Sequence, residues 1–446
     1  MNRWIQKRGL PLESLGLSLT QEVPKKKVLY QLNENQLFIP ASLAKVAVLS
    51  AFYYYYPSYF RFKTVLVSSA SINKNQLEGD LFIKGSGDPG FTSESLWKLV
   101  NNFVRTGIKE IKGDLVIDDT LFKKTYFLPY TDRSYTAPVN AASFNWNSLT
   151  FWIRPNSKVN SLAQIHLDPE NDFIKIINKI KTTSRSKNNI SLKRIKYSSK
   201  GETFLFTGTI SHKSKEIVKY TNTQNPSFWM GHNLKNFLKQ RGIIVRGRVK
   251  KGSCSKCKTL ATFKSRAFAF HSYNMMKYSS NFVTRMLTAY LPLRLGKKQG
   301  DLDQGIHWIN KYLKKQIGLK NYKMVEPSGL SRDNRFSVNH FQKILEHDFS
   351  RFYHPEIFVS YPIAGGVGTL EKKYHPKFSQ ILRAKTGSIS GVLGLSGYIL
   401  LPKNRRILFT FIYNGSPKNR DQAKGLFDDI LDFLRKKNNR FFKEFN

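Results

Sequence analysis

The feature that most constrains the fold is a segment near the N-terminus that is apolar on nearly every side. From Ala41 to Phe52 the only polar side chains are those of Ser42, Lys45 and Ser50. A helix with apolar residues all round is buried inside a domain. Burying a hydroxyl or an amine costs free energy unless the group has a partner, so these three residues need a structural or chemical role.

Periodic apolar patterns elsewhere predict a sheet covered by helices. Apolar residues at helical spacing predict helices over Leu96–Val104, closed by Gly107, and over Leu426–Leu434. Near the C-terminus, apolar, β-branched and aromatic residues predict strands; these cover Ile381–Ser388, Leu393–Leu401 and Ile407–Tyr413, with Pro402–Arg406 as the turn between the last two. Strands at both chain ends with helices between them are typical of a sheet flanked by helices.

The middle of the chain has a different composition. Residues 156–218 are rich in Lys, Asn, Ser and Thr, and they contain alternating, strand-like stretches such as Glu202–Thr209. We interpret this segment as a separate module or as a series of surface strands.

The chain carries a large positive charge. Lys and Arg number 73 against 30 Asp and Glu, which gives a formal net charge of +43. Such a charge indicates an anionic partner, namely a nucleic acid, an acidic membrane face or an acidic polymer, or else a solvated basic surface. The basic residues are spread along the chain without a long basic run or a recognisable nucleic-acid-binding motif, so we do not expect a nucleic-acid partner.

Cys254 and Cys257 are the only cysteines and form a C-x-x-C in a turn rich in Lys and Ser. A structural zinc site needs four ligands and a redox pair is expected beside a βαβ unit. We therefore expect bystander thiols or a local disulfide, with no metal and no other cofactor.

No apolar stretch reaches the roughly 18 to 20 residues of a membrane span. The basic N-terminus lacks a continuous apolar region, so either the protein is not exported or an export signal is missing from this sequence.

A glycine-rich turn over Gly85–Gly90 matches the pattern G-x-G-x-x-G and follows the strand-like Leu81–Ile83. A dinucleotide site needs the last glycine at the start of a helix. Here Pro89 and the Thr92–Ser93 cap place the helix beyond the glycines. We interpret the segment as a tight turn.

The buried helix carries a candidate nucleophile and its base. Ser42 and Lys45 are three residues apart, which puts the hydroxyl and the amine one turn apart on one face. A serine hydroxyl needs a base to take its proton, and burial lowers the pKa of a lysine by disfavouring its charged form. The pair can act without a histidine. Other Ser-x-x-Lys occurrences, which include those that begin at Ser95, Ser184, Ser253 and Ser255, lie in an amphipathic helix or in polar loops.

Two later segments complete an ordered set of motifs. Lys385-Thr386-Gly387 is the only K-[ST]-G of the chain and lies on a predicted strand. Ser279-Ser280-Asn281 has a central position and opens an apolar helical stretch, which distinguishes it from the other S-x-N occurrences. The order S-x-x-K, S-x-N, K-T-G is the signature of penicillin-binding proteins and serine β-lactamases.

Longer blocks around these motifs resemble the D-alanyl-D-alanine carboxypeptidases of the penicillin-binding protein 4 type, peptidase family S13. The similarity runs over most of the chain, and the later blocks and the long insert between Ser42 and Ser279 separate it from class A β-lactamases. The blocks are FIPASLAKV, FRFKT, LFIKGSGDPGFT, IKGDLVIDDTLF, APVNAASFNWNSL, EPSGLSRDNRFS, PIAGGVGTL and RAKTGSISGVLGLSGYI.

The resemblance implies an α+β fold of the penicillin-binding protein and serine β-lactamase type, an antiparallel sheet flanked by helices, with a large, mostly β insertion. The implied domains are a catalytic domain over 1–64 and 265–446, an inserted domain over 65–155 and 219–264, and a smaller nested domain over 156–218. The glycine-rich turn would then be a structural feature of the insertion.

The resemblance also implies a serine DD-peptidase that cleaves the terminal D-Ala-D-Ala bond of peptidoglycan stem peptides and D-Ala-mediated cross-links, with β-lactams as covalent inhibitors. Ser42 would attack the carbonyl and become acylated, and Lys45 would be its base. Ser279 would relay a proton to the leaving D-alanine, and Asn281 would hold the acyl substrate and Lys45.

The K-T-G strand would bind the substrate. Lys385 would support Ser279 and add positive potential, and the segment Thr386, Gly387 and Ser388 would receive the terminal carboxylate, through the hydroxyls of Thr386 and Ser388. The backbone N–H groups of Ser42 and Ser388 would form the oxyanion hole.

Other expectations from the resemblance leave alternatives open. An acidic residue of the insertion would approach the amino end of the peptide side chain, and Asp132 is the candidate; a plain surface-turn aspartate is the alternative. The family acts in the periplasm or on the cell surface, where anionic wall or outer-membrane polymers are further candidate partners. A non-catalytic wall-binding protein and a β-lactam-hydrolysing protein on the same scaffold are the alternative functions, and the oligomeric state stays open.

Overall fold

The computed structural model describes residues 2–129, 131–372, 378–379, 381–402 and 404–436. The chain divides into two compact units, and each is described by itself. The first unit comprises Met1–Phe60, Ala267–Arg294 and Asp303–Asn446. The inserted unit comprises Arg61–Arg266 and Leu295–Leu302.

The first unit is built on an antiparallel sheet to which both ends of the chain contribute. Its strand order is β18 (Leu382–Ile389), β19 (Val392–Leu401), β20 (Arg405–Asn414), β1 (Leu15–Val23) and β2 (Lys27–Leu32). Successive side chains of a strand point to opposite faces. Accordingly Leu15, Leu17 and Leu19 pack in one buried cluster with α10 (Arg420–Lys436), whereas Gly16 lies against Val338 of α8 (Val338–Phe349) on the other face.

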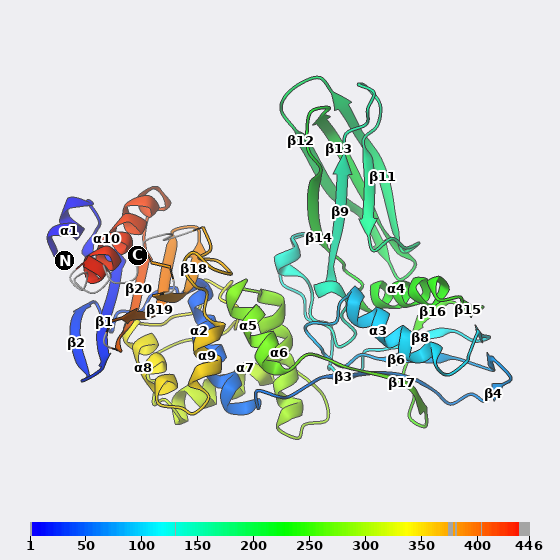
Figure 1. Cartoon of the computed structure of the whole chain (residues 1–446), viewed down its shortest axis with the longest axis horizontal. Helices are drawn as coiled ribbons and strands as arrows, with labels where there is room; N and C mark the ends of the chain where they lie inside the picture. Colours follow the sequence, from blue (N-terminus) through cyan, green and yellow to red (C-terminus); the bar gives the residue numbers. More distant parts are fainter. Residues whose placement is uncertain (1, 130, 373–377, 380, 403, 437–446) are drawn as a thin grey trace. The chain divides into compact units, whose positions relative to one another are not determined.

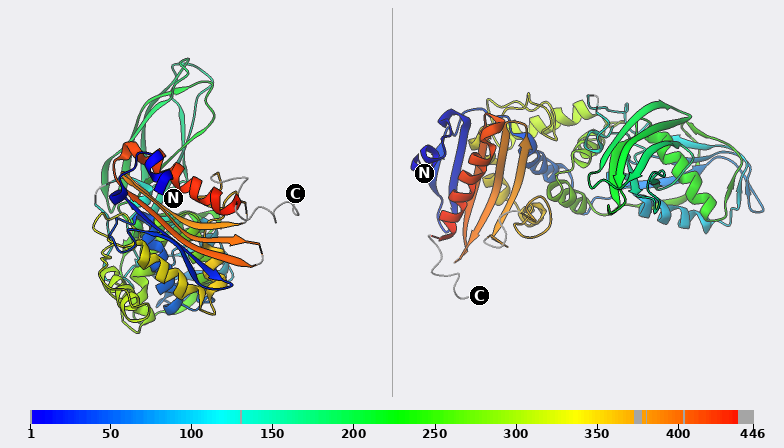
Figure 2. Two further views of the ribbon diagram at one scale, coloured as in Figure 1. Left: turned by 90° about the vertical axis from the view of Figure 1, so that its left-hand side faces the viewer. Right: turned by 90° about the horizontal axis from the view of Figure 1, so that it is seen from above.

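Helices from both chain ends cover the α10 face. The helix α1 (Asn2–Lys7) contacts α10, and the rings of Trp4 and Phe433 meet edge to face with centroids 5.3 Å apart. Figure 2 shows these helices, in blue and red, side by side against the sheet.

The predicted buried helix lies on the other side of the sheet, among helices. It consists of a 3-10 turn over Ala41–Leu43 followed by α2 (Ala44–Tyr55), which is buried from Ala44 to Tyr53. It contacts α6 (Asn281–Arg294), α8 and α9 (His354–Ser360); α5 (Phe268–Lys277) and α7 (Leu302–Lys315) complete the layer. Ser50 has a structural role, because its hydroxyl donates to Asp348 Oδ1 at 2.5 Å and lies 2.8 Å from the Tyr312 hydroxyl.

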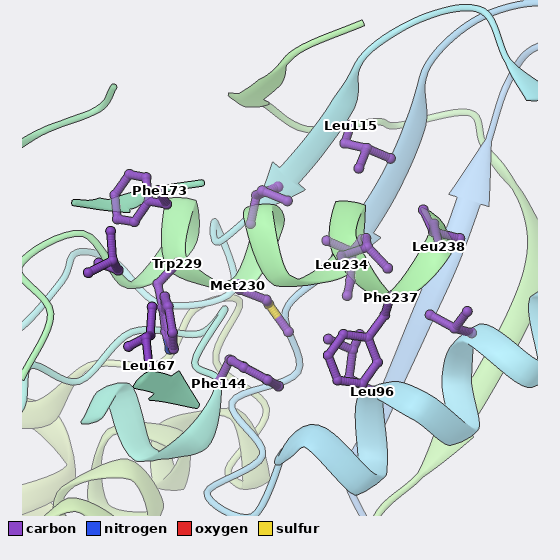
Figure 3. Close-up of a cluster of buried hydrophobic side chains, with 14 of the residues drawn as sticks. Leu96, Leu115, Phe144, Leu167, Phe173, Trp229, Met230, Leu234, Phe237 and Leu238 are labelled. Carbon is purple, nitrogen blue, oxygen red and sulfur yellow. The ribbon is translucent and has the colours of Figure 1, made fainter. Parts of the chain in front are cut away.

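The inserted unit begins with short strands around helices α3 (Ser93–Val104) and α4 (Pro226–Gln240). One sheet has the order β16 (Val249–Lys251), β8 (Leu115–Asp118), β6 (Leu81–Lys84), β3 (Lys63–Ser68) and β17 (Lys258–Lys264). Another has the order β15 (Ile244–Val245), β7 (Glu110–Ile111), β5 (Gln76–Leu77) and β4 (Ile72–Asn73). Figure 3 shows the core, in which Met230, Leu234 and Phe237 of α4 meet Leu96 of α3 and Leu115 of β8.

Longer strands form the rest of the inserted unit (Figure 1). One sheet runs β10 (Gln164–Asp168), β9 (Ser148–Arg154), β14 (Ile217–Asn222), and the other runs β11 (Ile174–Thr183), β13 (Gly201–Ser211), β12 (Asn189–Ser198). Phe151 of β9 packs on Phe204 and Phe206 of β13, within the same buried cluster as α3 and α4. A nested domain over 156–218 therefore stays a prediction.

The predicted elements are present, with shifted ends. The helix predicted from Leu96 begins at Ser93, the C-terminal helix spans Arg420–Lys436, and the stretch Glu202–Thr209 lies in β13. The hairpin of β19 and β20 is present, although Lys403 of its turn lies outside the described residues.

Two further expectations concern turns. The helix after the glycine-rich turn begins beyond the glycines, as expected; its first N–H, at Ser93, is capped by Asn145 Oδ1 at 2.9 Å and not by Thr92. Cys254 and Cys257 form a disulfide. Of the two alternatives expected for that turn, bystander thiols or a local disulfide, the second is confirmed. Among the described residues, no helix combines the length and apolar composition needed to cross a membrane.

Candidate active site

The candidate nucleophile lies on a tight turn pressed against the sheet. Ala41, just before Ser42, has a left-handed backbone with φ +46°, which non-glycine residues seldom adopt. Glycines allow the sheet and a loop to approach this turn. A Cβ at Gly329 would lie 1.9 Å from the carbonyl oxygen of Ala41, one at Gly387 would lie 2.8 Å from that of Pro40, and one at Gly394 would lie 2.7 Å from Leu43 Cδ1. The turn is thus held by close packing of β18, β19 and the Gly329 loop.

Lys45 lies one helical turn beyond the serine and is wholly buried. Its Nζ is 3.1 Å from Ser42 Oγ and 2.8 Å from Asn281 Oδ1, and it also donates to the carbonyl oxygen of Ser328. The carbonyl and amide oxygens can only accept hydrogen bonds. A neutral amine would use its two N–H groups on these oxygens, so its lone pair would face the Ser42 hydroxyl.

Burial sets the protonation of this lysine. Desolvation disfavours the ammonium form and lowers the pKa of Lys45 to about 7, although the negative charge of Glu326 raises it. The uncharged amine is therefore readily available near neutral pH, which suits a general base. The direction of this shift was expected from the apolar helix.

Glu326 was not predicted from the sequence. Its Oε1 accepts from the Ser328 hydroxyl at 2.6 Å and from the Ser328 N–H, and its Oε2 accepts from the Leu330 N–H at 2.9 Å. The carboxylate therefore shapes the loop whose Ser328 carbonyl binds Lys45. Glu326 lies in the EPSGLSRDNRFS block, which resembles the family, but nothing in that block indicated a role for this residue.

A hydrogen bond between a lysine and a serine joins the K-T-G and S-x-N motifs. Lys385 on β18 is buried, and its Nζ donates to Ser279 Oγ at 2.8 Å and to the Thr386 carbonyl at 2.7 Å. Ser279 has φ +55° and precedes α6, which begins at Asn281 as expected. Left-handed backbone at a non-glycine residue costs free energy and is found often at functional sites.

The end of β18 exposes hydroxyl groups next to a cation. The Thr386 hydroxyl donates to Thr369 Oγ1 at 2.9 Å, and the Arg420 guanidinium donates to Ser388 Oγ at 2.9 Å. Arg332 donates to the Ser390 carbonyl at 2.5 Å, so a second guanidinium lies at the same end of the strand. Gly387 between the two hydroxyl residues faces the nucleophile turn. Thr369, Arg332 and Arg420 were not predicted.

The structure thus brings together Ser42, Lys45 and Asn281 by direct contact, and Ser279 with Lys385. Asp132 belongs to the inserted unit, and its role stays a prediction. Its half-exposed carboxylate accepts from Arg194 Nη1 at 2.7 Å, and Arg194 is in turn paired with the buried Glu202 at 3.1 Å. Asp132 lines a hollow of about 720 Å³ together with Phe127, Tyr197 and other residues of this unit.

Comparisons with known proteins place the chain beside cell-wall peptidases. The model of the family described as D-Ala-D-Ala carboxypeptidase 3 (S13) matches residues 2–436. The chain is 22% identical to a D-alanyl-D-alanine carboxypeptidase DacB of Haemophilus influenzae, covering 95% of this chain and 90% of that protein. It is 23% identical to a D-alanyl-D-alanine carboxypeptidase of an Actinomadura species, covering 87% and 75%.

Solved structures agree on the fold. Penicillin-binding protein 4 of H. influenzae superposes with a TM-score of 0.80 at 22% identity, covering 96% of this chain and 98% of that one. A predatory peptidoglycan endopeptidase of Bdellovibrio bacteriovorus superposes with a TM-score of 0.55 at 15% identity, covering 95% and 92%. The predicted fold class, a penicillin-binding catalytic domain with a large insertion, is confirmed.

Proposed function

This chain belongs to the D-Ala-D-Ala carboxypeptidase 3 (S13) family, and on that basis we propose that it is a serine DD-peptidase of peptidoglycan. Its substrate is a stem peptide that ends in D-Ala-D-Ala, and its reaction is hydrolysis of that last peptide bond through an acyl-enzyme on Ser42. β-Lactams would acylate the same hydroxyl.

Acylation begins at the pair of Ser42 and Lys45. The neutral Lys45 amine takes the proton of the Ser42 hydroxyl as Oγ bonds to the carbonyl carbon of the penultimate D-alanine. The N–H groups of Ser42 and Ser388 stabilise the oxyanion that forms. The amide C–N bond then breaks, the amine of the terminal D-alanine gains a proton by way of Ser279, and D-alanine leaves.

Binding and deacylation complete the cycle. Thr386 and Ser388 hold the carboxylate of the terminal residue, and Lys385 keeps Ser279 in place. A water molecule then attacks the ester carbonyl, its proton passes to the base, and Ser42 regains its hydroxyl as the shortened peptide leaves.

One observation carries this proposal. The Lys45 Nζ lies 3.1 Å from Ser42 Oγ, is wholly buried, and has two further neighbours that can only accept hydrogen bonds. This arrangement supports a base that is neutral near pH 7 and aimed at the serine.

Release of D-alanine from a synthetic pentapeptide tests the activity. The wild-type protein should release the terminal D-alanine, and Ser42→Ala should not. Ser95→Ala is the matched control, because Ser95 also stands three residues before a lysine but on an amphipathic helix of the inserted unit. Equal turnover in the wild type and Ser42→Ala would refute the proposal, as would loss of turnover in folded Ser95→Ala.

We extend the proposal to D-Ala-mediated cross-links, because a similar fold is found in peptidases named endopeptidases. Asp132 is the candidate for the amino end of the peptide side chain, since its carboxylate is half exposed in a hollow. Chromatography of cross-linked muropeptide dimers measures this activity. Monomer release by the wild type but not by Ser42→Ala supports it, and intact dimers alongside D-alanine release would limit the enzyme to carboxypeptidase activity.

The rate at which the protein releases an acylated β-lactam distinguishes the competing functions. A β-lactam-hydrolysing enzyme turns over its drug, whereas a DD-peptidase releases acylated drug slowly. A non-catalytic wall-binding protein would not be acylated. We place the protein in the bacterial cell envelope, where its substrate is found, and we count anionic envelope polymers among its partners because of its charge of +43.

A further inference from the structure

One face of the sheet β11–β13–β12 is solvent-exposed and basic. The opposite face of this sheet is buried, since Phe204, Phe206 and Ile210 of β13 belong to the hydrophobic core. The strand register gives the composition of the exposed face row by row. The rows, in the order β11, β13, β12, are Lys175–Thr203–Lys196, Ile177–Leu205–Lys193, Lys179–Thr207–Ser191 and Lys181–Thr209–Asn189.

Every row of this surface, here called the lysine face, contains at least one lysine and none contains an acidic residue. All of its lysines are exposed. Within the part of the chain that the structure describes, none of them forms an ion pair or a side-chain hydrogen bond; they are Lys175, Lys179, Lys181, Lys193 and Lys196. Elsewhere in the same unit lysines are neutralised, as Lys250 is by Asp80 and Asp114.

The lysine face is therefore a single field of positive charge. Alternate residues of a strand lie about 6.6 Å apart and neighbouring strands about 4.8 Å apart. Lys179 and Lys181 are alternate residues of β11, whereas the lysines of β11 and β12 lie on either side of β13, about 10 Å apart. These separations are close to the Debye length of about 8 Å at physiological ionic strength, so the charges act together on a bound polymer. Packing does not explain the lysines, because the buried side of the sheet is complete without them.

We propose that the lysine face binds a phosphate-bearing anionic polymer that lies along the strands. The lysines would pair with the phosphates, and the hydroxyls of Thr203, Thr207 and Thr209 between them would donate hydrogen bonds. The face has no aromatic side chain on which nucleic-acid bases could stack. Its large apolar residues, Ile177 and Leu205, are too few to insert into a membrane surface as an amphipathic helix does.

Binding of long-chain inorganic polyphosphate over a range of salt concentrations tests the proposal. The test variant replaces Lys175, Lys179 and Lys181 by Gln. The matched control replaces the exposed Lys63, Lys74 and Lys109 of the same unit by Gln, which removes the same charge without touching the lysine face. If the β11 variant fails to fold, Lys193→Gln with Lys196→Gln provides a second test on β12.

The face variant should bind polyphosphate at least about tenfold more weakly, with a salt dependence less steep by about two to three charges, and the control variant should bind nearly as the wild type does. Ser42→Ala should bind normally, which separates this proposal from the peptidase activity. If both lysine variants weakened polyphosphate binding equally, binding would depend on net charge alone and the proposal would be wrong. Tighter, lysine-dependent binding of single-stranded DNA or of phosphatidylglycerol vesicles would overturn the proposed partner class.

Discussion

At the scale of single residues, the backbone around the nucleophile is as specialised as its side chains. Ala41 and Ser279 both have left-handed φ angles, and Gly329 makes room for the Ala41 carbonyl. These features fix where Ser42 Oγ and Ser279 Oγ point, next to the amines of Lys45 and Lys385. Substitutions that add one carbon atom near this turn should therefore lower the rate of acylation more than substitutions that change surface charge.

Gly329→Ala should abolish acylation by a β-lactam in protein that still folds, because its Cβ would lie 1.9 Å from the Ala41 carbonyl oxygen and displace the nucleophile turn. Gly318→Ala is the control. Gly318 has a similar φ of +74° but open space around it, so its substitution should cost only roughly 1–2 kcal/mol of stability. Second-order acylation rates and urea unfolding measure the two effects. Similar acylation by both variants would contradict the close-contact argument.

Glu326→Gln should shift the pH dependence of acylation. The base must be neutral, so acylation by the wild type should rise with pH through a pKa of about 7. The Glu326 charge raises that pKa, and its removal should lower it and move the rising limb to lower pH. If the acylation rate of Glu326→Gln rose at the same pH as that of the wild type, or at a higher pH, Lys45 would not govern the rate.

Arg420→Ala should weaken recognition of an anionic ligand, since the guanidinium donates to Ser388 Oγ where the substrate carboxylate is expected. Acylation by benzylpenicillin should fall roughly tenfold, as expected for one hydrogen bond to a charged group, while acylation by its uncharged methyl ester should change little. Arg420→Lys should recover part of the loss. Equal losses with both ligands would show that Arg420 acts on the fold of the site.

The sequence was sufficient for some of these residues and not for others. The contact between Ser42 and Lys45 could be predicted because spacing and burial are both local properties of one helix, and their catalytic roles stay a prediction. Ser279, Asn281 and Lys385 followed from the order of the motifs. Glu326 orders the loop whose Ser328 carbonyl binds Lys45 from 283 residues away, and its block was recognised only through the resemblance. Thr369 and Arg420 contact β18 from 17 and 32 residues away, and no local spacing marks them.

At the scale of secondary structure, α2 serves two different polar networks. Its first turn carries Lys45, and about one and a half turns later Ser50 joins the buried Asp348 and Tyr312. Burial raises the pKa of Asp348, so this carboxyl group depends on its hydrogen-bond donors. The Ser50 network therefore anchors the helix to α7 and α8.

Ser50→Ala should lower the free energy of unfolding by about 1–3 kcal/mol, the usual cost of leaving a buried polar partner unsatisfied. Acylation per folded molecule should stay unchanged, because Ser50 lies about 12 Å along the helix from Ser42 at 1.5 Å per residue. Denaturation midpoints and active-site titration measure the two quantities. Lost acylation at unchanged stability would contradict the separation of the two networks.

The ends of elements were harder to predict than their presence. The Ala41–Phe52 pattern predicts one continuous helix, yet its first turn is 3-10 because the backbone enters from Pro40 through the left-handed Ala41. Likewise α3 is capped by Asn145, which is far from it in sequence. Tertiary contacts decide such boundaries, and apolar periodicity does not report them.

At the scale of the whole molecule, the two ends of the chain build one unit and the middle builds another. The sheet order β18–β19–β20–β1–β2 joins the first strands to the last, which the strand-like patterns at both chain ends suggested. The insertion interrupts the unit without interrupting its sheet. The charge of +43 could be read from composition, but the alignment of five lysines on one exposed face depends on strand register and could not.

Labelling with a fluorescent penicillin tests most directly whether an acyl-enzyme forms on Ser42. Wild-type protein should carry one covalent label, located by mass spectrometry in the peptide that contains Ser42, and equally folded Ser42→Ala should carry none. Labelling of Ser42→Ala, or an adduct on another peptide of the wild type, would contradict the assignment of the nucleophile.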